Sequence, residues 1–333
     1  MRLDRILAAA FVVLVSTAII GFSAGNSGAS FTGTTTNPNQ SWATSNVAAP
    51  ASETATSAAA GQIDLSWPAT TTPANGHTVT YLVFRGGVQI ASTSGLTYSD
   101  TPASDGTYTY YIQTKIAQGS GFFTSGNSPS QSPLSDRTAP TMSATCNGGS
   151  CAGWFNASVT FIVSGNDGAG VGMGTATTNV DGAGAITSSA PRTVTVSGES
   201  ATHSVVYSGA DSVGNASGNT SKTVKIDLTA PTAATTITTA KGLSAGQITL
   251  TWTAGTDALS GVSGYTIHRS GVVASCPATN TTNYPNVTSV GVVTSATISG
   301  LVSASKYCFY LTTTDVAGNV SANSAAAGPQ AAK

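Results

Sequence analysis

The stretch Leu301-Val-Ser-Ala-Ser-Lys-Tyr-Cys-Phe-Tyr-Leu-Thr-Thr-Thr-Asp-Val-Ala-Gly-Asn319 carries the clearest pattern in the chain. From Tyr307 onward, Tyr, Phe and Leu alternate with Cys, Tyr and Thr, and this period of two places every second side chain on one face of a strand. The stretch then closes with Asp-Val-Ala-Gly-Asn, residue types that favour a turn. It therefore predicts a strand of an all-β fold that ends in a tight turn.

A leucine precedes this strand, and the first inward residue of the strand is a tyrosine. The pair Leu301 and Tyr307 resembles the tyrosine corner of fibronectin type III and immunoglobulin-like sandwiches, where the phenol hydroxyl ties a loop to the strand that enters the core. The resemblance implies that both residues mark the core of a β-sandwich.

An internal repeat supports the same fold. The motif Gln-Ile-x-Leu-x-Trp occurs at residues 62–67 and again at 247–252, and Tyr81–Arg85 parallels Tyr265–Arg269. Repetition within one chain indicates a duplicated structural unit. Both copies resemble fibronectin type III domains, with Trp67, Tyr108 and Trp252 as further core markers. In the first copy we expect strands at residues 62–67, 78–84, 88–92 and 107–115.

The segment between the two copies has different motifs. Val159, Phe161 and Val163 alternate as in a half-buried strand, and Gly and Asn mark the turns. The order of strands and turns from Gly153 to Asn215 resembles the bacterial immunoglobulin-like repeats of surface proteins.

The length of 333 residues accommodates three sandwiches of about 90–100 residues each. We expect an all-β chain of tandem immunoglobulin-like and fibronectin type III sandwiches at residues 48–137, 138–228 and 229–333. The motif Asp-x-Thr-Ala-Pro opens both the second and the third, at Asp136 and Asp227. Such short linkers favour a semi-rigid rod.

The N-terminus has the order of a secretory signal peptide. Arg2 and Arg5 precede an apolar run, and small residues follow it up to Ala29. We expect cleavage after Ala29, a flexible segment at residues 30–47, and a secreted or cell-surface protein. The alternative is an uncleaved anchor, because the run approaches the length that spans a bilayer; membrane contact is expected only in that case.

Four cysteines fall into two pairs, as expected for disulfides in an oxidising compartment. Cys146 and Cys151 enclose a short glycine-rich loop that a bridge would close. Cys276 lies in an insertion that the first repeat lacks, and a bridge to Cys308 would hold this insertion against the outer face of the strand. Free thiols are the alternative for this second pair.

Composition argues against several classes of function. A net charge of −1, with scattered Lys and Arg, excludes the basic patch that binds nucleic acid. His77, His203 and His268 are isolated, and no catalytic motif is present, so we expect no enzyme and no catalytic residue. Phe122-Phe123 follows a predicted strand, where it offers an adhesive contact or, alternatively, packs one ring into the sandwich edge.

The acidic residues concentrate at the expected domain junctions. Three loops of a sandwich meet at one pole, and in the second and third domains these carry Asp136, Asp167 and Asp211, and Asp227, Asp257 and Asp315, with Asp105 and Glu199 facing them from the preceding domains. These carboxylates could supply the oxygen ligands of calcium and stiffen the rod. The alternative is that each aspartate caps its own turn, and no cofactor is then required.

These features lead to the expectation of a non-catalytic rod that acts as a spacer or adhesion module. Its partner would be a surface protein or a polysaccharide. The alternative function is a carbohydrate- or cell-wall-binding accessory module linked to polysaccharide degradation, which aromatic side chains clustered on one exposed face would favour.

Overall fold

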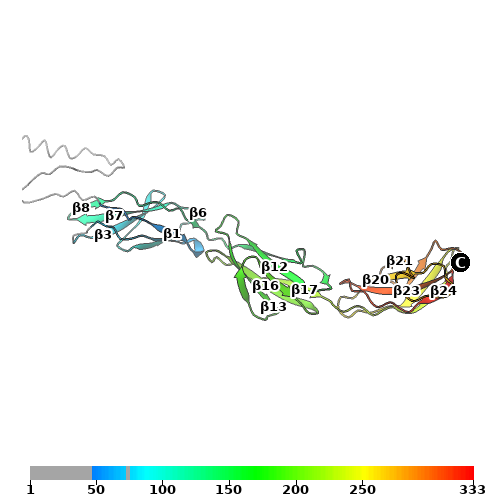
Figure 1. Cartoon of the computed structure of the whole chain (residues 1–333). Helices are drawn as coiled ribbons and strands as arrows, with labels where there is room; N and C mark the ends of the chain where they lie inside the picture. Colours follow the sequence, from blue (N-terminus) through cyan, green and yellow to red (C-terminus); the bar gives the residue numbers. More distant parts are fainter. Residues whose placement is uncertain (1–46, 73–75) are drawn as a thin grey trace, which may run out of the picture. The chain divides into compact units, whose positions relative to one another are not determined.

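The computed structural model describes residues 47–72 and 76–333 (Figure 1). The predicted signal peptide at 1–29 and nearly all of the segment at 30–47 lie outside the described residues. The chain divides into two compact units, one ending at Arg137 and one spanning Thr138–Lys333. None of the helices in the described part has the length and apolar character needed to cross a membrane. The fold is all-β, in tandem immunoglobulin-like and fibronectin type III β-sandwiches.

The first unit holds one sandwich. A sheet with the order β1-β2-β5 faces a sheet with the order β4-β3-β7-β8, and a short ladder joins β6 to β9. The elements are β1 (Thr54–Ser57), η1 (Ala59–Gly61), β2 (Ile63–Ser66), β3 (Val79–Arg85), β4 (Val88–Thr93), β5 (Thr97–Asp100), β6 (Gly106–Thr107), β7 (Tyr110–Gln118), β8 (Gly121–Thr124) and β9 (Leu134–Ser135).

The core of the first sandwich consists of the alternating inward residues of both sheets. Trp67 is 5% exposed and packs against Tyr81, with ring centroids 5.8 Å apart. The strand expected at 107–115 is broken after Thr107, because Tyr108 and Tyr110 donate their N–H groups to Pro133 and Gln131. Tyr108 is therefore half-buried at the edge of the core, while Tyr110 is fully buried.

The second sandwich begins the second unit. A sheet with the order β10-β12-β15 faces a sheet with the order β11-β17-β16-β13-β14, in which β11 pairs with β17 in parallel. Val159, Phe161 and Val163 are fully buried. The elements are β10 (Thr141–Cys146), β11 (Trp154–Phe155), β12 (Val159–Asn166), β13 (Met173–Val180), β14 (Ile186–Ser189), β15 (Arg192–Val196), β16 (Ser200–Asp211) and β17 (Thr220–Ile226).

The third sandwich ends the second unit. Its sheets have the orders β18-β19-β22 and β21-β20-β23-β24. Leu301 and Tyr307 are buried, and the Val302 N–H donates to Tyr307 Oη at 3.1 Å, which is the corner expected from the sequence. The elements are β18 (Thr235–Lys241), β19 (Ile248–Thr253), β20 (Val262–Arg269), β21 (Asn286–Val290), β22 (Ser295–Ile298), β23 (Lys306–Asp315) and β24 (Ala327–Ala331).

Candidate functional site

Both expected disulfides are present. Cys146 bonds to Cys151 and closes the loop after β10, and Cys276 bonds to Cys308 on β23. No free cysteine occurs between residues 47 and 333, apart from the undescribed residues 73–75. The pairing therefore confirms the interpretation of the two cysteine pairs as bridges.

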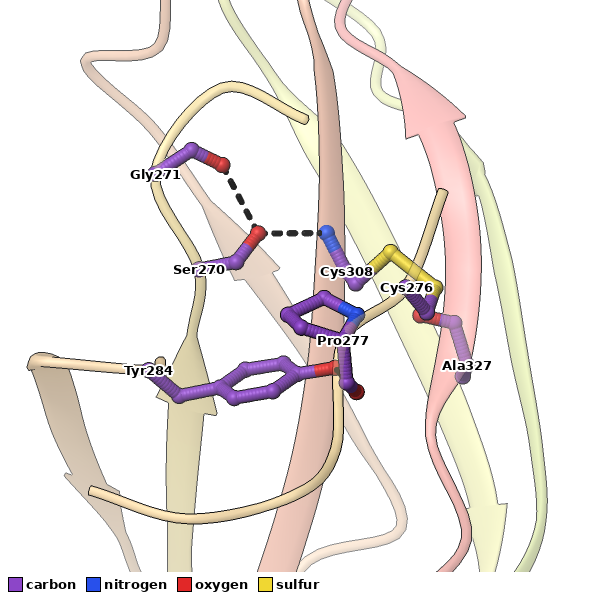
Figure 2. The surroundings of a disulfide bond; sticks show 7 residues. All are labelled: Ser270, Gly271, Cys276, Pro277, Tyr284, Cys308 and Ala327. Carbon is purple, nitrogen blue, oxygen red and sulfur yellow. Dashed lines mark hydrogen bonds between the residues drawn. A yellow bond between two sulfur atoms is a disulfide. The ribbon is translucent and has the colours of Figure 1, made fainter. Parts of the chain in front are cut away.

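The second disulfide fastens a covering segment to the outer face of the third sandwich (Figure 2). Ser270 Oγ bridges the start of the segment, donating to Gly271 O at 2.7 Å and accepting from the Cys308 N–H at 3.0 Å. Tyr284, fully buried, donates its hydroxyl to Pro277 O at 3.1 Å. The covering segment, residues 271–285, thus forms a small second core with Cys308 and Tyr310.

Two rings of the sheet lie beneath this segment. His268 stacks on Tyr310 with centroids 4.3 Å apart, and Tyr284 meets Tyr310 edge-on at 4.9 Å. Burial lowers the pKa of His268, and its Nδ1 has no hydrogen-bond partner among the described residues. A buried imidazole with a lowered pKa favours the neutral form, and here its ring packs against Tyr310.

The aspartates at one pole of the third sandwich come together. Asp227, Asp257 and Asp315 each place a carboxylate oxygen within 4.8 Å of the other two. Asp315 Oδ1 accepts the N–H groups of Gly318 and Asn319 at 2.6 and 2.8 Å, so it caps the turn after β23.

Asp257 and Asp227 also accept backbone N–H groups. Asp257 Oδ1 accepts from Leu259 and Gly261, and Asp227 Oδ1 accepts from Thr229. Burial alone would raise the pKa of Asp227, but hydrogen bonds, from Ser260 first, outweigh it and lower the pKa. The geometry thus satisfies turn capping in full, and calcium binding by the same carboxylates stays a prediction.

Further junction acids accept backbone N–H groups within each unit. Asp105 accepts the Arg137 N–H in the first unit, where Asp136 is buried. Asp211 accepts the Asn215 N–H at 2.9 Å in the second unit and repeats the turn of Asp315. Asp167 Oδ2 accepts from Gly172. A joint calcium site of Asp136 with the second-unit acids stays a prediction.

The backbone of Asp227 is hydrogen-bonded to both the second and the third sandwich, which belong to the same unit. The Asp227 N–H donates to Phe155 O at 2.9 Å, and Asn319 Nδ2 donates to Asp227 O at 2.9 Å. Glu199 Oε2 accepts the hydroxyl of Thr229 at 2.9 Å. The linker is therefore held by hydrogen bonds from both sides.

Sequence reasoning assigned no role to Glu53, although it is one of only two glutamates in the chain. Glu53 is 3% exposed, and its Oε2 accepts from Ser128 Oγ at 3.0 Å. Desolvation by burial raises the pKa of Glu53 to about 7, and the Ser128 hydrogen bond opposes this only in part. The only feature of the sequence that could have marked Glu53 is the rarity of glutamate. A sequence pattern does not show that a side chain preceding the first strand is buried.

Phe122 and Phe123 lie on β8, and neither ring packs into the sandwich edge. They are 60% and 50% exposed, and Lys115 Nζ lies 4.3 Å from the ring centroid of Phe122. The alternative of a buried ring is therefore wrong, because β8 is an edge strand with no sheet beyond it.

The chain is similar to several solved structures, all at low sequence identity. No family model matches the chain, and no curated protein matches it. Similar solved structures include the FN1-FN3 domains of chicken CNTN1, with 15% identity, TM-score 0.36, and coverage of 84% of this chain and 97% of that one. Domains A168-A170 from titin give 15% identity, TM-score 0.40, and coverage of 86% and 96%. The fibronectin(III)-like modules of Clostridium thermocellum CbhA give 17% identity, TM-score 0.31, and coverage of 52% and 94%. The fold assignment itself rests on the strands and cores described above.

Proposed function

We propose that this chain is an exported, non-catalytic rod of β-sandwiches that acts as a spacer or adhesion module at the cell surface or in the extracellular matrix. The observation that carries the proposal is the linker at Asp227, which Phe155 binds from the second sandwich and Asn319 from the third. A linker held on both sides resists bending more than a solvated one, and a spacer needs this property.

Two further features support export. Both disulfides join cysteines that lie close in space, and disulfides persist in oxidising compartments. The basic and apolar order of residues 2–24, followed by small residues, is typical of a signal peptide.

Export is tested by fractionating the cells that produce the protein and sequencing the N-terminus of the exported material. The proposal expects a mature chain that begins at or near Ser30 and contains no free thiol. Retention of residues 1–29 in the membrane fraction would convert the assignment to an anchored protein. A cytoplasmic chain with four reduced cysteines would overturn it.

A carbohydrate- or cell-wall-binding accessory module is the second candidate. Its supporting observation is the pair of exposed rings on β8, since exposed aromatic side chains often contact sugars in binding modules. A glycan array probed with the mature protein tests this candidate, with Phe122→Ala as the variant that should lose signal. A protein pull-down on the same material tests the adhesion function.

A further inference from the structure

A stacked ring pair occupies the same place in the first and third sandwiches. Phe84 lies opposite Tyr111 in the β3–β7 ladder, and His268 lies opposite Tyr310 in the β20–β23 ladder. The centroids are 4.8 and 4.3 Å apart, with interplanar angles of 13° and 4°. These positions alternate with core residues, so both pairs lie on the outer face of their sheet.

In the third sandwich this pair is covered by residues 271–285. Tyr310 is 1% exposed and His268 is 9% exposed. The covering segment has no charged residue, and it places Pro277 and Tyr284 over the sheet. The structure thus shows which chemistry covers such a pair: an uncharged loop with a tyrosine and a proline.

In the first sandwich the corresponding segment is replaced by a short turn. Gly86 and Gly87, with φ of 56° and 83°, join β3 directly to β4 in a conformation that favours glycine. Phe84 and Tyr111 remain half-buried, and in the described part of the first unit the one cluster of buried hydrophobic residues lies between the sheets.

The rest of this outer face is apolar or neutral. Phe122 lies on it and is 60% exposed, Leu82 lies on it but is only 8% exposed, and Lys115 is the sole charged residue among the outward positions of β3, β7 and β8. Because the face carries one positive charge and no negative charge, a partner segment needs no basic residue. An uncharged or weakly acidic segment is compatible with this face.

We propose that the outer face of the β4-β3-β7-β8 sheet is a docking site for an uncharged segment of another polypeptide that presents a tyrosine to the Phe84–Tyr111 pair. The third sandwich supplies the argument for this occupant, because there a segment of this chemistry fills the same face. This inference deepens the adhesion half of the proposed function by naming the contact surface. Its failure leaves the export and linker experiments unaffected, so the two outcomes are distinguishable.

The test is a titration of the isotope-labelled mature protein, residues 30–333, with a synthetic peptide of residues 271–285 carrying Cys276→Ser. We expect saturable changes in the amide resonances of β3 and β7. Phe84→Ala should weaken binding about tenfold or more, as loss of an aromatic anchor does. Phe84→His, which rebuilds the ring pair of the third sandwich, should retain binding. Ile186→Ala, an exposed apolar change on β14, is the matched control and should leave affinity unchanged.

A change on the peptide side keeps the test valid if Phe84→Ala fails to fold. Tyr284→Ala in the peptide should also weaken binding about tenfold on the unmodified protein. No saturable change, or equal binding of the Tyr284→Ala peptide, would overturn the proposal. Oligosaccharides that perturb the same resonances, with the peptide inactive, would also overturn it and assign the face to carbohydrate.

Discussion

The first and third sandwiches share the Gln-Ile-x-Leu-x-Trp motif and its buried residues but have different surfaces. Ile63, Leu65 and Trp67 are buried in one, and the equivalent residues of the third sandwich are buried in the other. The third sandwich, however, carries a disulfide-fastened cover on its outer face and an aspartate cluster at one pole. The first sandwich has a two-glycine turn where the cover would begin, and its ring pair is only half-buried.

Core and surface are therefore set by separate parts of the sequence. Alternating apolar residues determine the sheets in both copies, because each must bury the same face. Loops and outer positions are free of this constraint, and they carry whatever is specific to each sandwich. The predictions below test this separation.

Matched core substitutions should have equal effects in the two copies. Leu65 and Leu250 occupy the same position in the repeat and are 2% and 0% exposed. Either Leu65→Ala or Leu250→Ala should destabilise its own sandwich by about 2–5 kcal/mol. Denaturant unfolding, followed by hydrogen exchange resolved by sandwich, measures this. A strong effect of Leu65→Ala on the third sandwich would contradict the independence of the cores.

Removal of each disulfide should destabilise its own sandwich by an amount that increases with the length of the loop it closes. The Cys276–Cys308 bridge spans a sequence separation of 32, against 5 for Cys146–Cys151. Loop-closure entropy predicts a loss of about 4 kcal/mol for Cys276→Ala with Cys308→Ala.

The matched control is Cys146→Ala with Cys151→Ala, for which the same relation predicts about 2 kcal/mol. Chemical denaturation compares the two double variants. Equal losses would show that the cover adds no stability through its bridge.

Glu53 should make the stability of the first sandwich depend on pH. Its pKa is raised from 4.5 to about 7 in the folded state, so the fold favours the protonated form. Stability is then highest below pH 4.5 and declines as pH rises to about 7, by about 3 kcal/mol for a shift of this size. Glu53→Gln should abolish the decline and stabilise the sandwich at pH 8. Melting curves from pH 4 to 8 measure this, and a wild-type melting temperature of the first sandwich that is independent of pH would contradict it.

The turn of the third sandwich should weaken when Asp315 is removed. Asp315 accepts two backbone N–H groups and the Asn319 amide, so Asp315→Ala should cost about 1–3 kcal/mol in the absence of calcium. Calorimetry and melting at millimolar calcium then separate the two interpretations of the cluster. If the aspartates only cap turns, the stability lost in Asp315→Ala is the same with and without calcium. If they bind calcium, Asp315→Ala costs more stability in the presence of calcium, and Asp257→Ala abolishes the stabilisation by calcium.

The sequence predicts cores well, but it does not predict what covers them. The alternation in Tyr307–Leu311 and the repeated Gln-Ile-x-Leu-x-Trp motif were sufficient for the sandwich fold, because burial of one face imposes a period of two. The pairing of Cys276 with Cys308 also followed from the extra segment in the third copy. These features are local in sequence or repeated.

Other features depend on contacts between distant segments. The break of the strand at Tyr108 comes from pairing with residues 131–133, which periodicity does not reveal. Glu53 accepts a hydrogen bond from the distant Ser128, and stacking of Phe84 on Tyr111 depends on the β3–β7 register. Alternation in the sequence shows which residues of a strand lie on the outer face of the sheet. It does not show whether another segment covers those residues.

The linker between the second and third sandwiches is held from both sides, as a spacer requires. The most direct measurement is a pulsed electron paramagnetic resonance distance between spin labels at Ile186→Cys and Val287→Cys, both exposed positions. The account predicts a narrow distance distribution that broadens in Asn319→Ala, because the hydrogen bond to Asp227 is lost. A wild-type distribution as broad as that of a variant with a Gly-Ser insertion of about ten residues after Leu228 would contradict the account.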